Sequence, residues 1–184
     1  MIVALIVIAV IAALLAFAYV SLYNGIVMKN NRCDNAWQTI DAQLQRRNDL
    51  IPNLVETVRG YAQHESKTLD QVTNARAAVA SATTPETKMV ASAELSGALS
   101  RLMVSVEAYP ELKANTTFQQ LQQDLTDTEN KISYARMSYN DCVLAYNNAI
   151  TTFPGNVVAG TKFRRREGFA LVTESVREVP EVKF

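Results

Sequence analysis

The chain has 184 residues, a length typical of one domain, and its 18 basic residues balance its 18 acidic ones. A nucleic-acid binding surface needs a clustered positive excess, so the zero net charge argues against a nucleic-acid partner. One histidine and two cysteines are too few for a structural zinc site or a disulfide framework. We therefore expect no metal and no cofactor.

The first part of the sequence has the features of a membrane anchor. Residues 2–20 form an unbroken apolar run, and about 20 helical residues cross the roughly 30 Å hydrocarbon layer. No charged residue precedes the run, and the stretch after it lacks an Ala-x-Ala pattern, which argues against a cleaved signal peptide. We predict a single-pass anchor over residues 1–28. Lys29 and Arg32 follow it, so the positive-inside rule favours a cytoplasmic location for the rest of the chain.

Residues 21–61 repeat apolar side chains at alternating steps of three and four, as a helix does when it buries one face. Pro52 is expected to kink this helix, although the repeat continues beyond it in register. Arg47 is the charged exception within the repeat from residue 37 onward. The seam predicted on this helix comprises Trp37, Ile40, Leu44, Arg47, Ile51, Pro52 and Leu54.

A second repeat runs from residue 118 to residue 153 and predicts a long coiled-coil-like helix. Thr116 and Gln119 have the spacing of a capping box at its start, and Pro154-Gly155 marks its end. The seam predicted on this helix, with the charged residue next to it, comprises Phe118, Leu121, Leu125, Glu129, Ile132, Tyr139 and Tyr146.

Two shorter helices are expected in between. The first covers residues 65–82, and the second begins at Thr84 as N-cap and ends at Pro110. Alternation typical of a strand appears only weakly, over residues 169–179. The sequence thus predicts an all-α fold in which one N-terminal transmembrane helix continues into a long antiparallel bundle of about four helices. The bundle is assigned to residues 29–160, and a short irregular basic tail to residues 161–184.

Antiparallel packing of the two long helices brings Arg47 within about one turn of Glu129, so we predict an ion pair. Such a pair specifies register more than it adds stability, because desolvation offsets much of the Coulomb attraction. The alternative is a ligand-binding role. The only residues that suggest an enzyme are three carboxylates near the middle of the bundle, Asp49, Asp127 and Glu129. HExxH, phosphate-loop and nucleophile-elbow motifs are missing, so no catalytic residue is assigned.

Two further groups of residues leave alternatives open. Lys162, Arg164, Arg165 and Arg166 follow the last long helix, where they either attract anionic lipid headgroups or form a solvated loop with Glu167. Cys33 and Cys142 fall at facing seam positions. A disulfide between them is geometrically conceivable, but free buried thiols are the expectation in a reducing cytoplasm.

Four blocks, in order, resemble the LemA family of bacterial membrane proteins: AWQTIDAQLQRRNDLIPNLVETVRGYAQHE (36–65), EAYPELKAN (107–115), FQQLQQDLTDTENKISYARMSYND (118–141) and YNNAITTFPGN (146–156). This resemblance implies an N-terminal anchor in the inner membrane, a long antiparallel helical bundle and no established enzymatic activity. After Gly168 the chain reads ALVTESV where relatives often carry a PYFE-type stretch, so the role of the family's tail is not transferred.

Two functions remain in competition at this point. The first is a non-enzymatic scaffold that self-associates into a homo-oligomer. Small residues, which let helices approach closely, are frequent over 74–82 and 90–98, and four alanines lie on one side of the apolar run. The second is a receptor or adaptor whose bundle presents a groove to a peptide or to another membrane protein. Membrane lipid is a partner in both.

Overall fold

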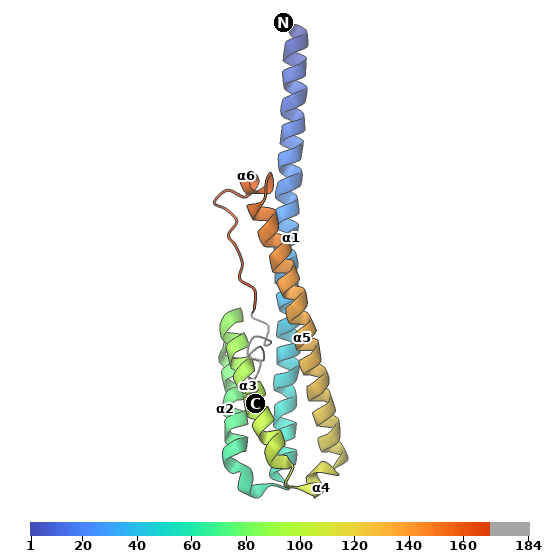
Figure 1. Ribbon diagram of the computed structural model, residues 1–184, viewed down its shortest axis with the longest axis vertical. Coiled ribbons are helices and arrows are strands. Elements are labelled where there is room, and N and C mark those ends of the chain that lie inside the picture. The colour runs from blue at the N-terminus through green and yellow to red at the C-terminus, as the bar shows by residue number, and fades with distance from the viewer. Residues whose placement is uncertain (170–184) are drawn as a thin grey trace, which may run out of the picture. The chain divides into compact units, whose positions relative to one another are not determined.

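The computed structural model describes residues 1–169, which contain helices and no strand (Figure 1). The elements in chain order are α1 (Ile2–Arg59), η1 (Gln63–Glu65), α2 (Ser66–Ser81), α3 (Pro85–Val106), α4 (Pro110–Lys113), α5 (Thr116–Thr151) and α6 (Gly155–Ala159). The all-α prediction is confirmed. The weak strand pattern lies outside the described residues apart from Phe169, which is in neither helix nor strand.

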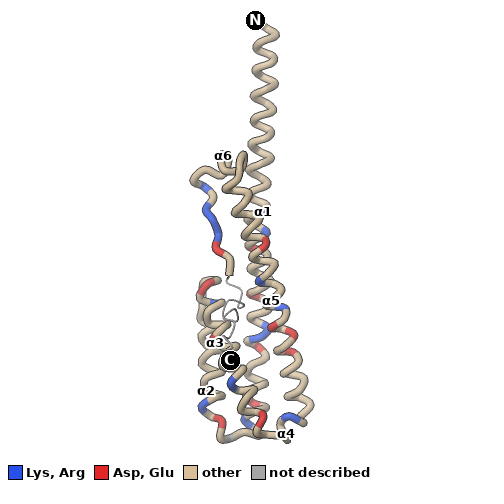
Figure 2. The backbone as a smooth tube through the Cα atoms, in the orientation of Figure 1, with Lys and Arg blue, Asp and Glu red and all other residues tan. Residues whose placement is uncertain are grey.

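Helix α1 is one continuous helix of 58 residues that contains Pro52. Its first 20 residues are all exposed and carry no charged side chain (Figure 2). An apolar surface of this length is suited to lipid. Helix α3 also has the length and composition of a membrane span, but it buries Leu95 and Leu102 completely in the bundle core. The N-terminal part of α1 is therefore the candidate membrane anchor.

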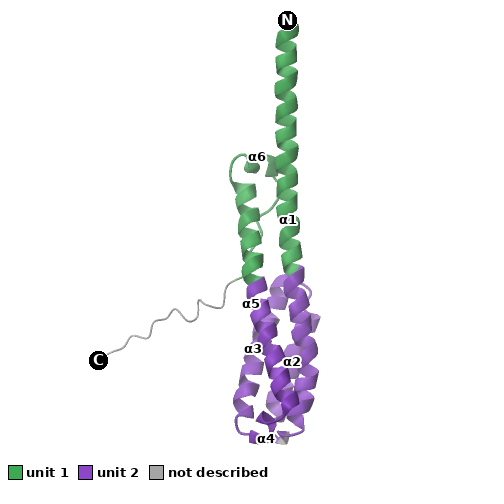
Figure 3. Cartoon of the chain, turned by 90° about the vertical axis from the view of Figure 1, so that its right-hand side faces the viewer, with its two compact units in different colours: residues 1–37, 136–184 green, residues 38–135 purple. Residues whose placement is uncertain are grey.

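The chain divides into two compact units (Figure 3). One contains residues 1–37 and 136–184, and the other contains residues 38–135. The second unit is a helical bundle built from the C-terminal part of α1, from α2 and α3, and from the N-terminal part of α5.

Apolar residues that recur every three or four positions on these helices meet in one core. Its largest fully buried members are Ile51, Leu54, Leu95, Leu102, Leu112 and Phe118. Asn115 Nδ2 donates to the Tyr61 hydroxyl (3.0 Å) where α1 and α5 approach the connecting loops, and Arg47 pairs with Glu129 farther along both helices. These two contacts show that α1 and α5 run antiparallel.

In the first unit, the stretch of α1 that follows the apolar run lies beside the C-terminal part of α5 and the short helix α6 (Figure 3). Ile26 and Cys33 on α1 are buried, as are Tyr139 and Tyr146 on α5. Trp37 is half-buried and meets Tyr139 edge to face at 6.5 Å between ring centroids. This unit therefore joins the apolar run directly to a packed part of the molecule.

The helix starts agree with the sequence in part. Thr84 caps α3 as predicted, because its hydroxyl accepts from the Thr87 N–H at 3.2 Å. Helix α5 begins at Thr116, but its cap is Asn115, whose Oδ1 accepts from the Phe118 N–H at 3.0 Å. The capping box assigned to Thr116 is thus wrong, since an N-cap lies one residue before the first helical residue.

The end of α5 also differs from the expected pattern. The helix ends at Thr151, and Phe153, which the repeat placed on the seam, is 82% exposed. Val143 and Ile150 are buried in place of half-buried Cys142 and Ala149. A straight helix drifts about 20° per heptad relative to a 3.5-residue repeat. A repeat of that period that starts on the buried face at residue 118 therefore no longer follows the buried face at residue 153. Pro110 begins α4 rather than closing the bundle helix before it, because proline suits the first turn of a helix.

Candidate functional sites

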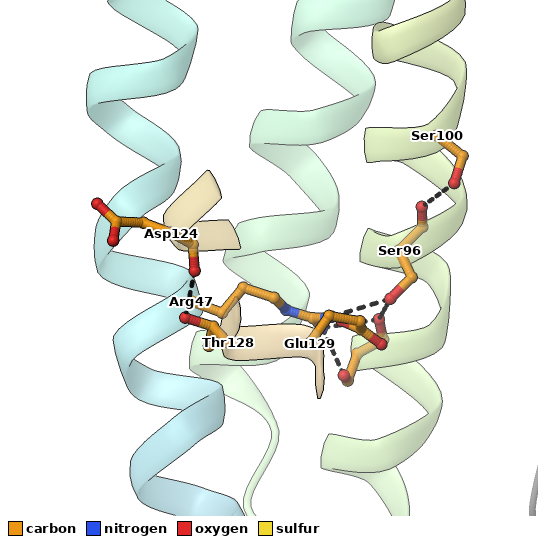
Figure 4. A network of polar contacts seen from close by, with 7 residues as sticks. Arg47, Ser96, Ser100, Asp124, Thr128 and Glu129 are labelled. Carbon is orange, nitrogen blue, oxygen red and sulfur yellow. Dashed lines mark hydrogen bonds and ion pairs between the residues drawn. The ribbon is translucent and has the colours of Figure 1, made fainter. Parts of the chain in front are cut away.

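Arg47 is the centre of a polar network inside the bundle (Figure 4). Its side chain extends from α1 and is only 2% exposed. The guanidinium donates to Ser96 Oγ (2.9 Å), to the Ser92 carbonyl oxygen (2.9 Å) and to Ser92 Oγ (2.5 Å), all on α3. It also pairs with the Glu129 carboxylate of α5. One side chain thus joins three helices.

The Arg47–Glu129 pair confirms the contact expected from the register of the two long helices. The Glu129 side chain is 53% exposed, so this pair lies at the edge of the bundle rather than at its centre. Thr128, the next residue on α5, is fully buried and donates its hydroxyl to the Asp124 carbonyl oxygen of its own helix at 2.7 Å. An internal hydrogen bond of this kind explains how a polar residue is accommodated on the seam.

An open groove of about 590 Å³ runs between α3 and α5 beside this network. Apolar side chains of Leu99, Met103 and Leu125 line it, together with the polar residues Ser96, Ser100, Gln122, Thr126, Glu129 and Asn130. Arg47 also lines it, and Arg47 Nε is buried without a hydrogen-bond partner within the described chain. The groove combines an apolar wall with a buried donor, which are the features of a small binding cleft.

The three carboxylates considered for catalysis are not brought together. Asp49 accepts from Gln45 Nε2 at 2.8 Å, and Asp127 accepts from Gln123 Nε2 at 3.1 Å, each within its own helix. Glu129 binds Arg47. Residues 1–169 contain no cluster of three or more His, Cys, Asp or Glu side chains that could hold a metal ion.

In the first unit, residues 164–169, which we call the strap, are held by two asparagines of α5. Asn147 Nδ2 donates to the Arg166 carbonyl oxygen (2.9 Å), and Asn147 Oδ1 accepts from the Arg166 N–H (3.0 Å). Asn140 makes the same pair of bonds to Phe169, at 2.8 and 2.9 Å. Each amide therefore replaces the backbone partner that an extended segment would find in a sheet.

Side chains of the strap add further contacts. Arg166 Nη2 lies 2.7 Å from Asp34 Oδ1, and Arg166 Nε donates to Asn30 Oδ1 at 3.0 Å. The Phe169 ring stacks on Tyr139 with centroids 4.8 Å apart and lies 5.6 Å from the Trp37 ring. Arg166, expected as one of four headgroup ligands, is thus held by α1.

The other basic residues of the tail lie differently. Lys162 Nζ donates to the Tyr23 hydroxyl on α1, and this hydrogen bond raises the pKa of Lys162. Phe163 meets the same tyrosine edge to face at 5.6 Å between centroids. Arg164 and Arg165 are exposed. Lys162 and Phe163 therefore lie beside the end of the apolar run.

Cys33 and Cys142 are free thiols in the structure. Cys33 is completely buried and Cys142 is half-buried. Burial raises the pKa of the Cys33 thiol, and burial also raises the pKa of Tyr146, whose hydroxyl donates to the Arg164 carbonyl oxygen at 3.0 Å. Both groups are therefore protonated at neutral pH.

Comparison with known proteins identifies the family of this chain. The model of the LemA family matches residues 36–184, more than half of the chain. The chain belongs to the LemA family.

Individual relatives agree with this assignment. Protein LemA of Metamycoplasma hominis is 27% identical over 144 residues, which cover 78% of this chain and 66% of that protein. Magnetosome protein MamQ 2 of Paramagnetospirillum magneticum is 29% identical, and magnetosome protein MamQ of Magnetospirillum gryphiswaldense is 26% identical, each over 174 residues. These alignments cover 80% of this chain and 64% of each MamQ protein. The chain spans slightly less than two thirds of these relatives.

Asn140, Asn147 and Asp34 were not singled out from the sequence. A signal was present, because the two asparagines are seven residues apart on one helix and so lie on the same face. Their partners are backbone atoms of a segment without a repeat. Sequence periodicity therefore gives no indication of what they bind.

Proposed function

We propose that this LemA family member is a non-enzymatic scaffold, anchored in the inner membrane by α1, which self-associates into a homo-oligomer. The observation that carries this proposal is the continuity of α1. The helix passes without a break from an exposed apolar run to the buried residues Ile26 and Cys33. A membrane-spanning segment joined in this way places the packed domain directly at the bilayer surface, and Lys29 and Arg32 favour its cytoplasmic side.

Two exposed faces support self-association. Ala9, Ala12, Ala13 and Ala16 lie on one side of the apolar run, where small residues let helix backbones approach closely in lipid. On α5, Met137 and Leu144 are 51% and 60% exposed and are seven residues apart, which puts two large apolar side chains on the outside of one helix. Some small residues of α3 contribute less, because Ala91 and Ala98 are buried within the bundle.

A cysteine scan of the apolar run tests the proposal. Cys33 and Cys142 are first replaced by alanine, and single cysteines are then introduced from residue 9 to residue 16 in the full chain in native membranes. We expect oxidative cross-linking at Ala9, Ala12, Ala13 and Ala16, and little at Ile11 or Leu14 on the opposite side of the helix. Uniformly absent cross-linking would exclude self-association through this face.

The α3–α5 groove favours a second candidate, an adaptor that binds a peptide or a helix of another membrane protein. A photo-cross-linking amino acid at Ser100, an exposed residue of the groove, distinguishes the two functions. The scaffold proposal expects no heterologous product from this position. A single reproducible adduct whose mass is not a multiple of the chain would favour the adaptor.

A further inference from the structure

We propose that residues 153–165 form an interfacial element that rests on anionic phospholipid headgroups beside the anchor. This inference rests on the anchoring part of the proposed function and goes beyond it by naming a second membrane contact. Its components are the turn after α5, helix α6 and the basic residues Lys162, Arg164 and Arg165.

The position of the element follows from its contacts with Tyr23. This tyrosine lies three residues after the apolar run, which is about 4.5 Å along the helix axis. Lys162 bonds its hydroxyl and lies 4.8 Å from its ring centroid, while Phe163 packs against the ring edge. Tyr19 stacks on Tyr23 from the membrane side, with centroids 6.4 Å apart. Aromatic rings of this kind gather at the level of the headgroups.

Two large apolar side chains are exposed on this element. Phe153 is 82% exposed and Val157 is 71% exposed. Gly155 and Ala159 are buried, and a Cβ on Gly155 would lie 2.0 Å from the Ala149 carbonyl oxygen, so α6 is packed tightly onto the end of α5. Within this unit, α6 lies at the end of α5 from which the apolar part of α1 extends (Figures 1 and 3). Phe153 and Val157 are therefore presented where the bilayer begins.

The charges complement an anionic surface. Arg164 and Arg165 are exposed, and no residue within 1–169 forms an ion pair with either. Arg166 is different, because Asp34 and Asn30 bind its guanidinium and Asn147 binds its backbone. Arg166 thus attaches the end of the basic run to α1 and α5, and Arg164 and Arg165 are left available to bind anionic headgroups. Basic residues adjacent to an apolar surface are the usual combination for binding anionic membranes.

Tryptophan fluorescence of the full chain in nanodiscs tests the depth of the element. Trp37 is replaced by phenylalanine, and single tryptophans are introduced as Phe153→Trp, Leu14→Trp or Met137→Trp. The discs contain phosphatidylcholine alone or mixed equally with phosphatidylglycerol, with bromine on the upper acyl chain as a quencher. Met137 is the matched control, since it is exposed on α5 and lies 16 residues before Phe153.

We expect quenching and a blue-shifted emission for Phe153→Trp, more strongly with phosphatidylglycerol, and no quenching for Met137→Trp. Loss of quenching at Leu14 and Phe153 together would overturn the anchor itself. Quenching at Leu14 without quenching at Phe153 would overturn this inference and leave the anchor in place.

Charge is tested by adding Arg164→Gln and Arg165→Gln to the Phe153→Trp chain. We expect the increment in quenching due to phosphatidylglycerol to be lost, while Arg46→Gln with Lys67→Gln, which removes the same charge from exposed positions, leaves it unchanged. Equal quenching in both lipids, unaffected by the arginines, would overturn the assignment to anionic headgroups. Far-ultraviolet circular dichroism of every variant establishes that the helices are intact.

Discussion

Replacing Arg47 with alanine tests how much the buried guanidinium stabilises the bundle. The substitution removes four contacts with Ser92, Ser96 and Glu129 and the two methylenes, Cγ and Cδ, that pack among the helices. Glu129 is half exposed, so water solvates its carboxylate again and the cost of leaving it unpaired is small.

The expected loss of stability follows from the groups that the substitution removes. Two methylenes at about 0.8 kcal/mol each contribute about 1.6 kcal/mol, and the three lost hydrogen bonds to Ser92 and Ser96 contribute about 1 kcal/mol each. The sum is about 3 to 5 kcal/mol, and it comes from lost packing and lost hydrogen bonds to the serines rather than from an unpaired Glu129. In a chain of this size it lowers Tm by about 6 to 20 °C.

The assay is thermal unfolding of the detergent-solubilised chain, followed by circular dichroism, with Arg46→Ala as control because Arg46 is the exposed neighbour on the same helix. Arg47→Met keeps an apolar stem and is expected to recover most of the loss. Equal Tm values for Arg46→Ala and Arg47→Ala would refute the reasoning.

Three further predictions concern other contacts. Thr84→Ala removes the cap of α3 and should cost about 1 kcal/mol of unfolding free energy in denaturant titration, whereas Thr84→Ser should not. Cys33, with its raised pKa, should react with iodoacetamide more slowly than Cys142 at mildly alkaline pH when each is the only cysteine; equal rates would show that the Cys33 thiol is accessible. Phe169→Ala should red-shift the emission of Trp37, since it removes a ring 5.6 Å away; an unchanged spectrum would show that the strap does not cover the indole.

Much of the bundle could be predicted because burial repeats along a helix. Ile40, Leu44, Ile51 and Leu54 are buried as their spacing indicates, and the same spacing identified Arg47 as the exception. A repeat of 3.5 residues per turn follows the true period of the α-helix over two or three heptads only. Phe153 was therefore misplaced, and Val143 and Ile150 were missed.

The strap could not be predicted by such means. Asn140 and Asn147 bind backbone atoms of residues 166 and 169, which any sequence at those positions would supply. Asp34 holds Arg166, whereas Arg164 and Arg165 stay exposed, so residues of one basic run differ in role through tertiary contacts alone. The groove beside Arg47 depends on how far α3 and α5 stand apart, and helix periodicity carries no information about that separation.

Native mass spectrometry of the protein released from membranes would test the scaffold most directly. One spectrum reports both whether the apolar run is retained and how many copies assemble. The account predicts membrane-derived particles at whole multiples of the uncleaved chain. A single copy, or a shorter soluble chain that begins beyond the apolar run, would contradict it.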